Sequence, residues 1–324
     1  MIDYRRLNRL ATTAILPLMF LTVAVAARHG TSTPSPESVS LPREGVLVAA
    51  NLREDSLTFH DLQSGGATRT LQLPGPPHEL AYAGDRMYAT LGRENLLVEV
   101  APAAPGVLRT LSLDGQPHGL ATDGPNLLVT LDTAAELLTV DRASLSVTSQ
   151  SPTGDTPHIV AAIDGGVYVA AARQNQLTEV SSGRSLATGD LPEGLALVGP
   201  YLVSTDNQGG TLTIVRRDSF TLAGIVSVGG EPVRAVALDD HRAMVALNGA
   251  GRLAVVDLAA QKIERELTVD ARPDGICVSP SGQYVAVASN ALGTLTILKT
   301  SDWSRVGTIP GIAGLGSCLW LPGH

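Results

Sequence analysis

The sequence predicts an all-β fold, a seven-bladed β-propeller, from three observations. A motif of about forty residues recurs along most of the 324-residue chain, and the apolar runs between its copies are only four to six residues long. The chain also has 33 glycines and 20 prolines, which suit many short strands joined by turns. Four short strands in every forty residues is the pattern of a propeller blade.

A Pro-x-x-apolar-small element marks the first strand of each predicted blade. Its first six copies begin at Pro77, Pro117, Pro157, Pro192, Pro232 and Pro273. They are spaced by 40, 40, 35, 40 and 41 residues, and a degenerate seventh copy begins 41 residues later at Gly314. Residues 45–324 number 280, which is seven repeats of forty.

Three further strands follow the first strand in each repeat. Second strands are expected at residues 46–50, 127–131, 202–205 and 284–289. Third strands are expected at the apolar runs that begin at Leu57, Leu96, Leu137, Leu177, Leu212, Leu253 and Leu295. Fourth strands are expected at residues 68–73, 108–113 and 263–269.

The two ends of the repeat region predict how the ring closes. The region opens with a second strand at residues 46–50 and ends with a lone first strand at residues 317–321. We therefore expect one blade to combine three N-terminal strands with one C-terminal strand. Closure of this kind removes the exposed sheet edges that promote aggregation.

Residues 1–27 are predicted to be a signal peptide or an N-terminal anchor. Three arginines among the first nine residues precede an uncharged apolar run at residues 10–27, and residues 24–26 (Ala-Val-Ala) form a small-x-small cleavage signal. Pro17 within the run favours cleavage. Because positive charge precedes the run, the rest of the chain should lie outside the cytoplasm in either case, with membrane contact only through an uncleaved segment.

Residues 28–44 are rich in Ser, Thr and Pro and are predicted to be a linker, because this composition cannot bury a core. Without residues 1–26, the 23 basic and 31 acidic residues of the chain become 20 and 30, so the net charge changes from −8 to −10. Nucleic acid is therefore not an expected partner, because an acidic surface repels phosphates. Aromatic residues make up only 3% of the chain, too few for extended stacking surfaces.

The sixth repeat resembles a known family of propeller repeats. Residues 273–282 read Pro-Asp-Gly-Ile-Cys-Val-Ser-Pro-Ser-Gly, and residues 284–290 read Tyr-Val-Ala-Val-Ala-Ser-Asn. This is similar to the YVTN-type β-propeller repeat, in which P-x-G-I-A-V-S-P-D-G leads to a Tyr-Val-Thr-Asn strand end. The resemblance covers about residues 45–324 and implies an exported seven-bladed propeller without an assigned reaction. A WD40 propeller fits less well, because Trp303 and Trp320 are not in Trp-Asp pairs.

The residues that follow the repeat prolines are candidate metal ligands. Each should open an innermost strand at one end of the central channel. In ring order they are His78, His118, His158, Glu193, Val233 and Asp274. Imidazole and carboxylate groups bind zinc and related divalent ions, so we expect a metal site formed by the three histidines with Glu193 or Asp274. The alternative is that repeat duplication copied a histidine that binds a carbonyl in its turn.

Glu79 and Arg234 are candidate ligand-binding residues. They stand one place further along the repeat, where Gly119, Gly194 and Gly275 stand in other copies. A departure from glycine at this position predicts contact with a ligand. The alternative is that both side chains are solvated at the rim.

Cys277 and Cys318 occupy the same repeat position in the last two copies. A disulfide is permitted outside the cytoplasm and would hold the closing strand in place. However, equivalent positions should point the same way around the ring, and small residues such as Ala81 and Ala121 fill this position elsewhere. These two observations favour buried free thiols.

The expected function is non-catalytic binding of a partner protein or small ligand at the channel mouth. A role in metal handling, as in the propeller-type periplasmic zinc chaperones, is its specific form. The alternative is a metal-dependent enzyme, because Pro-His-Gly at residues 117–119 resembles the streptogramin lyases, whose active site uses histidines, a carboxylate and a metal. His78 and His158 share only the Pro-His part of that motif. Lactonase-type propellers are a third possibility, with no distinguishing motif here.

Overall fold

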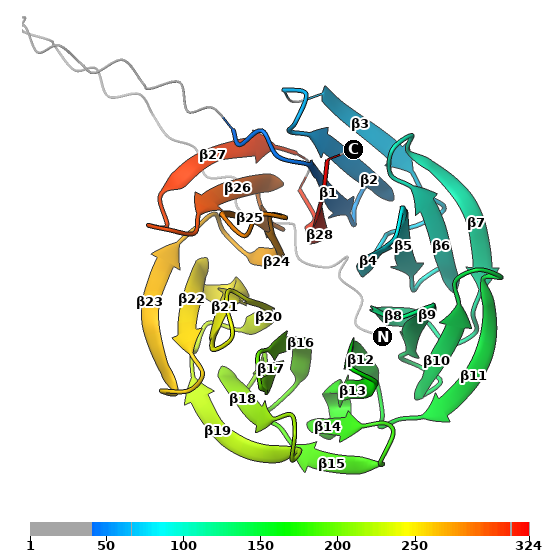
Figure 1. The fold of residues 1–324 in the computed structure, drawn as a ribbon, viewed down its shortest axis with the longest axis vertical. Helices are drawn as coiled ribbons and strands as arrows, with labels where there is room; N and C mark the ends of the chain where they lie inside the picture. Colours follow the sequence, from blue (N-terminus) through cyan, green and yellow to red (C-terminus); the bar gives the residue numbers. More distant parts are fainter. Residues whose placement is uncertain (1–40, 66, 312, 324) are drawn as a thin grey trace, which may run out of the picture. The chain divides into compact units, whose positions relative to one another are not determined.

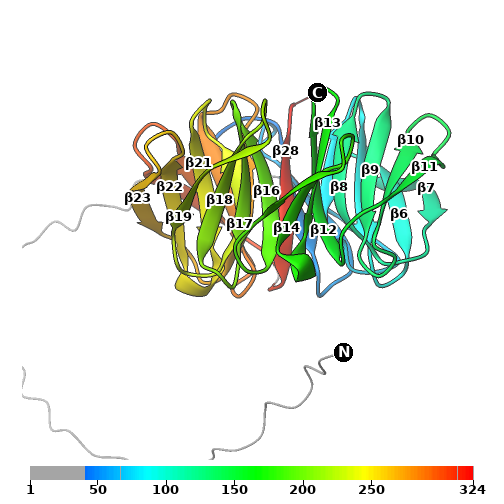
Figure 2. The ribbon, with the colours of Figure 1, turned by 90° about the horizontal axis from the view of Figure 1, so that it is seen from below.

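The computed structural model describes residues 41–65, 67–311 and 313–323, which form a ring of seven four-stranded antiparallel sheets (Figure 1). Seen from the side, the strands run between the two faces of the ring (Figure 2). The prediction of an all-β, seven-bladed propeller is confirmed. The predicted signal or anchor segment and residues 28–40 of the predicted linker lie outside the described residues. The described part of the chain has no helix that is long and apolar enough to cross a membrane.

The four strands of each blade step outward from the channel. The innermost strands are β4 (Leu80–Ala83), β8 (Pro117–Asp123), β12 (Pro157–Ile163), β16 (Pro192–Val198), β20 (Pro232–Ala237), β24 (Pro273–Val278) and β28 (Leu315–Leu321). The second strands are β5 (Arg86–Leu91), β9 (Asn126–Leu131), β13 (Gly166–Ala171), β17 (Tyr201–Asp206), β21 (Arg242–Leu247), β25 (Tyr284–Ser289) and β1 (Val46–Asn51).

The outer half of each blade contains the other two strands. The third strands are β6 (Leu96–Ala101), β10 (Glu136–Asp141), β14 (Gln176–Glu179), β18 (Thr211–Arg216), β22 (Arg252–Asp257), β26 (Thr294–Lys299) and β2 (Ser56–Asp61). The outermost strands are β7 (Gly106–Ser112), β11 (Ser146–Pro152), β15 (Arg184–Ala187), β19 (Thr221–Ser227), β23 (Lys262–Thr268), β27 (Arg305–Pro310) and β3 (Ala67–Gln72). Two short 3-10 turns, η1 (Ala172–Gln174) and η2 (Asn248–Ala250), follow second strands.

The core lies between neighbouring blades, and this explains which strands are most apolar. Strand β21 is buried at every residue after its first, whereas β23, at the outer edge of the same blade, exposes most of its residues. Between two adjacent blades, Val203 and Ile214 pack in one cluster with Val245 and Ala254. A second strand packs on both faces and therefore reads as a continuous apolar run.

The ring closes as predicted, because β28 pairs antiparallel with β1. The closing blade thus contains three N-terminal strands and one C-terminal strand. Glu44, the last residue of the predicted linker, is bound to this part of the ring. Its backbone oxygen accepts a hydrogen bond from Trp320 Nε1 at 2.8 Å, and its carboxylate accepts one from Ser281 Oγ at 2.8 Å.

The structure joins Cys277 of β24 and Cys318 of β28 in a disulfide, with Cα atoms 5.8 Å apart, so the prediction of free thiols is wrong. The reason is an offset of one residue in the last repeat. Cys277 pairs with Ala286, the third residue of β25, whereas Cys318 pairs with Ala49, the fourth residue of β1. Successive residues of a strand face opposite sides of its sheet. The two thiols therefore face each other between adjacent blades.

We expect the double substitution Cys277→Ser and Cys318→Ser to lower the free energy of unfolding by about 4 kcal/mol. The bond closes a loop with a sequence separation of 41 residues. Closing such a loop lowers the entropy of the unfolded chain, and this loss corresponds to about 4 kcal/mol of stability. Urea denaturation of oxidised protein measures the change. Wild-type protein with a reductant should match the variant. Equal stability of oxidised and reduced wild type would contradict the assignment of this disulfide.

Candidate functional site

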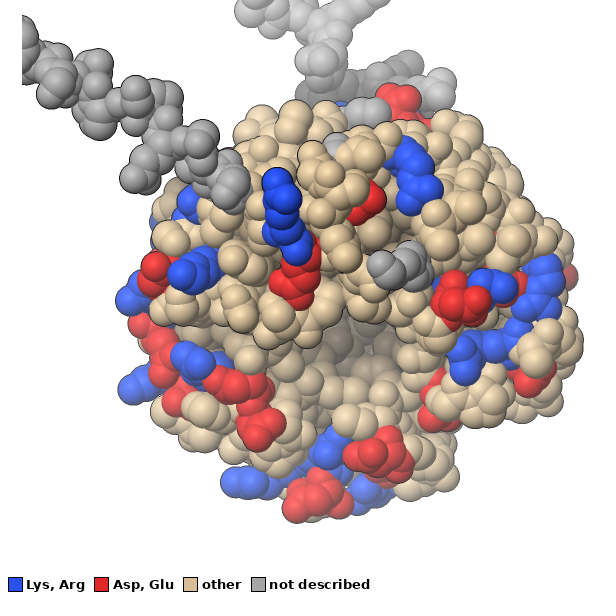
Figure 3. Space-filling view, turned by 45° about the horizontal axis from the view of Figure 1, so that its top comes forward, with Lys and Arg blue, Asp and Glu red and all other residues tan. Residues whose placement is uncertain are grey.

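A cavity of about 230 Å³ lies in the central channel. A space-filling view shows the centre of the ring hollowed, with most of the charged side chains in view around its outside (Figure 3). The residues that line the cavity include His78, Glu79, His118, His158, Glu193, Arg234 and Asp274. The structure therefore brings together all seven residues that the sequence predicted for the site.

A β-bulge at the start of the innermost strands turns these residues toward the cavity. In β12, β16 and β20, one extra residue, respectively His158, Glu193 and Val233, interrupts the pairing with the second strand. In β8, His118 and Gly119 together stand opposite a single residue of β9. A bulge breaks the alternation of a strand and re-aims side chains, so two consecutive residues of one repeat can both line the cavity.

The three histidines form a stack of imidazole rings. The ring centroids of His78 and His118 are 4.2 Å apart, and those of His118 and His158 are 3.8 Å apart. Burial lowers the pKa of all three, and that of His118 falls to about 4. The rings are therefore neutral at neutral pH, which is the state in which imidazole binds a metal ion.

A hydrogen bond fixes which nitrogen of His118 is free. Its Nδ1 lies 2.8 Å from the backbone oxygen of His158. Because a carbonyl oxygen only accepts, Nδ1 carries the hydrogen and Nε2 keeps its lone pair. The accepting carbonyl belongs to the next blade and not to the turn of His118, as the repeat-duplication alternative would have it, and the contact fixes the ring in the way that metal sites require.

Hydroxyl groups from neighbouring blades hold the backbone of the three histidines. Thr90 Oγ1 donates to the backbone oxygen of His118 at 2.7 Å, and Ser317 Oγ donates to the backbone oxygen of His78 at 2.6 Å. Thr130 Oγ1 lies 3.5 Å from the oxygen of His158. Each hydroxyl connects one blade to the next, so the imidazole stack rests on a rigid part of the ring.

Asp132, which the sequence analysis did not identify, lies beside His118 and His158. One ligand atom from each of the three residues lies within 4.8 Å of the others. Within the described ranges, no other three His, Cys, Asp or Glu residues bring their ligand atoms this close together. The group contains none of His78, Glu193 and Asp274. Burial raises the pKa of Asp132 to about 7, and its Oδ1 is buried without a hydrogen-bond partner among the described residues.

The repeat explains why a carboxylate at this position is unusual. Asn248 and Asn290, which also directly follow second strands, donate their side-chain amides to the carbonyl that opens the next innermost strand, at 3.0 and 3.2 Å. Asp132 has no N–H and cannot donate to the equivalent carbonyl, that of Pro157. An alignment of the residues after each second strand would have singled out Asp132 from sequence.

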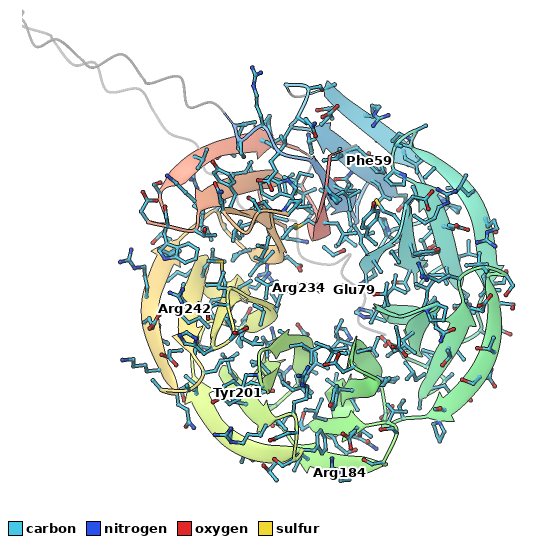
Figure 4. The ribbon with its side chains drawn as sticks, in the orientation of Figure 1. Phe59, Glu79, Arg184, Tyr201, Arg234 and Arg242 are labelled. Atoms are coloured by element: carbon cyan, nitrogen blue, oxygen red, sulfur yellow. A yellow bond between two sulfur atoms is a disulfide. The ribbon has the colours of Figure 1, made fainter. Side chains whose placement is uncertain are left out.

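Glu79 and Arg234 form an ion pair that connects two non-adjacent blades. Arg234 Nη1 and Nη2 donate to Glu79 Oε2 and Oε1 at 2.9 and 2.8 Å. Figure 4 labels both residues beside the central channel. Burial alone would raise the pKa of Glu79, but the Arg234 guanidinium holds it below its ordinary value. Glu79 is only 7% exposed, so the solvated-rim alternative is wrong for this residue.

Glu193 and Asp274 come from the blades on either side of Arg234. Burial raises the pKa of both carboxyl groups, and repulsion from Asp274 contributes to the pKa of about 7 for Glu193. Asp274 Oδ1 lies 3.8 Å from Arg234 Nη2. No hydrogen bond joins either carboxylate to another described residue at this end of the channel.

Known proteins resemble this chain in fold only. No family model and no curated protein sequence matches it. A functionally unknown protein from Desulfotomaculum acetoxidans is 13% identical over 86% of this chain and 100% of its own, with a TM-score of 0.72. Apo AztD from Citrobacter koseri is 13% identical over 87% and 98%, with a TM-score of 0.63. A streptogramin B lyase is 14% identical over 75% and 86%, with a TM-score of 0.65.

We expect Arg234→Met to destabilise the protein more than Glu79→Gln. Loss of Arg234 leaves buried carboxylates without a cation, which costs about 3–5 kcal/mol, whereas loss of the Glu79 charge leaves Arg234 beside Asp274 and costs about 1–2 kcal/mol. Urea denaturation measures both changes in the free energy of unfolding. Equal losses would show that Glu79 alone compensates Arg234.

Replacing both His118 and His158 with Asn should reduce the loss of stability in acid. The unfolded chain takes up protons near the ordinary histidine pKa of 6.5, whereas folded His118 does so only near a pKa of about 4. Protons therefore favour the unfolded state as the pH falls through this window, and the histidine contribution is complete above it. Buried Glu193, Asp274 and Asp132 act oppositely in both proteins, so the difference between the two pH profiles isolates the histidines. If the free energy of unfolding changes with pH in the same way in the wild type and the variant, the imidazoles are not neutral, buried groups.

Proposed function

We propose that this chain is an exported propeller of the YVTN-repeat type that binds a divalent metal ion at the channel mouth and takes part in metal handling. His118, His158 and Asp132 are the proposed ligands. The observation that carries this proposal is the Oδ1 atom of half-buried Asp132, which lies beside two neutral imidazoles and is itself buried without a hydrogen-bond partner among the described residues. A buried polar group without a partner is costly, and a metal ion would satisfy it.

The chemistry of the three groups fits zinc or a related ion. Two imidazole nitrogens and one carboxylate oxygen are ligands that such ions accept, and a site with three protein ligands keeps a further position open. The contact from His118 Nδ1 to the His158 carbonyl supplies the outer hydrogen bond that orients a ligating ring. His78 lies next to His118, with the ring planes tilted by 50°, and is outside the group of three ligands.

His118 lines both the cavity and a neighbouring pocket of about 320 Å³, which Asp132 also lines, so a small ligand or a partner protein could reach the metal there. Export is supported by the charged and apolar pattern of residues 1–27. It is also supported by the disulfide between Cys277 and Cys318, because disulfides persist in oxidising compartments. Metal exchange with a partner outside the cytoplasm is the role that these features support.

A metal-dependent lyase or lactonase is the second candidate. The observation that favours it is Glu193, which lines the same cavity with a pKa of about 7, suited to accepting a proton at neutral pH. This candidate requires turnover of a substrate, whereas the metal-handling role requires only reversible binding. Both candidate functions depend on a bound metal, so metal content and affinity are to be measured before turnover.

The substitution Asp132→Asn tests the site with two readouts of opposite sign. It removes a ligand, so zinc affinity should fall by at least about 100-fold, the upper end of the effect of losing even an outer-sphere partner. It also restores the amide that Asn248 and Asn290 use, so the metal-free protein should gain about 1 kcal/mol from a hydrogen bond to the Pro157 carbonyl. Calorimetric zinc titration and urea denaturation, on protein without a His tag, measure the two effects.

The matched control is Asp114→Asn, which neutralises an exposed carboxylate in the connection that leads into the blade of Asp132 and should change neither quantity. Zinc content measured by mass spectrometry should be stoichiometric in wild-type and control proteins and absent from Asp132→Asn. Undiminished zinc binding by Asp132→Asn would rule out this ligand set. A loss of stability in Asp132→Asn would show that Asp132 has a structural role instead.

A further inference from the structure

The side of the cavity opposite the proposed metal ligands has more carboxyl groups than its own cation can pair with. Glu79, Glu193 and Asp274 line it, and among the lining residues that the structure describes, Arg234 is the one with a permanent positive charge. This side therefore has a surplus of carboxyl groups.

Arg234 does not form hydrogen bonds with all three carboxylates, because its guanidinium group is oriented toward only one of them. Both of its terminal nitrogens donate to Glu79. Asp274 lies at 3.8 Å, beyond a hydrogen bond, and Glu193 has no hydrogen bond with a described residue. Arg234 Nε is buried and has no partner among the described residues. Because Nε has no surface open to the cavity, what the cavity presents is two carboxyl groups in need of donors.

The size of the cavity and its other lining residues limit the kind of ligand that could bind to these groups. A volume of about 230 Å³ admits only a small molecule. No Trp, Tyr or Phe lines the cavity in the described part of the chain, and a quaternary ammonium group requires such aromatic faces. Val233, from the blade between those of Glu193 and Asp274, offers a short apolar contact.

We propose that this side of the cavity binds a small primary ammonium ligand, with its N–H groups donating to Glu193 and Asp274. The short carbon chain of the ligand would lie against Val233. The proposal rests on the proposed role of the channel mouth as a ligand site but not on the metal, because the metal ligands come from other blades. It assigns the class of ligand as a small primary amine.

Calorimetric titration of the full chain with ethanolamine tests this proposal, in a buffer free of primary amines and with a chelator present. We expect saturable binding of one ethanolamine per chain. Choline, which replaces the three N–H groups with methyl groups, should bind at least about tenfold more weakly, as should uncharged ethylene glycol; tenfold corresponds to about 1.4 kcal/mol. The variants Glu193→Gln and Asp274→Asn should each weaken ethanolamine binding by a similar factor. The control Glu54→Gln changes an exposed carboxyl group and should have no effect.

Three results would overturn the proposal: no ethanolamine binding, equal binding of choline, or unchanged binding in both Glu193→Gln and Asp274→Asn. Thermal denaturation confirms that each variant is folded, so that lost binding is not lost structure. If the protein binds zinc but not ethanolamine, the amine subsite alone is ruled out. If it binds ethanolamine but not zinc, the metal site alone is ruled out.

Discussion

Seven innermost strands converge on one narrow channel, and their close approach is the constraint on which the rest of the structure depends. A Cβ atom added at Gly119 would lie 2.8 Å from the backbone oxygen of His158, and one at Gly275 would lie 2.3 Å from that of Gly316. Neighbouring strands are therefore in backbone contact at the channel mouth. Contacts between adjacent blades, among them Thr90 to the His118 carbonyl and the disulfide, hold the ring at this spacing.

The same convergence creates the electrostatics of the site. Ionisable residues from six blades meet in one cavity, and burial there disfavours the charged form of each group that lacks a partner. The imidazoles are neutral, and burial raises the pKa values of Glu193, Asp274 and Asp132. Among the described residues that line the cavity, only Glu79 and Arg234 form a hydrogen-bonded ion pair. Unpartnered buried groups reduce stability, and a protein retains them where a ligand satisfies them.

The residues of the candidate site differ in how they could be recognised from sequence. His118 and His158 stand in a repeated motif and were visible as candidate metal ligands, and Glu79 and Arg234 were visible as departures from glycine. Asp132 stands in a turn after a second strand, outside the motif, and its significance depends on a hydrogen bond that asparagines make in two other blades. The cysteines were visible as a pair, but their pairing depended on a one-residue offset in β28.

The sequence by itself determined the number of blades, the way the ring closes and which residues gather at the channel mouth. It could do so because a repeat of constant length places equivalent residues at equivalent points of a ring. Only the tertiary structure decided the bulges that turn His158 and Glu193 inward, the contact between Glu79 and Arg234, the position of Asp132 and the disulfide. These features depend on strand register and on distances across the channel or between blades, and repeat spacing contains neither.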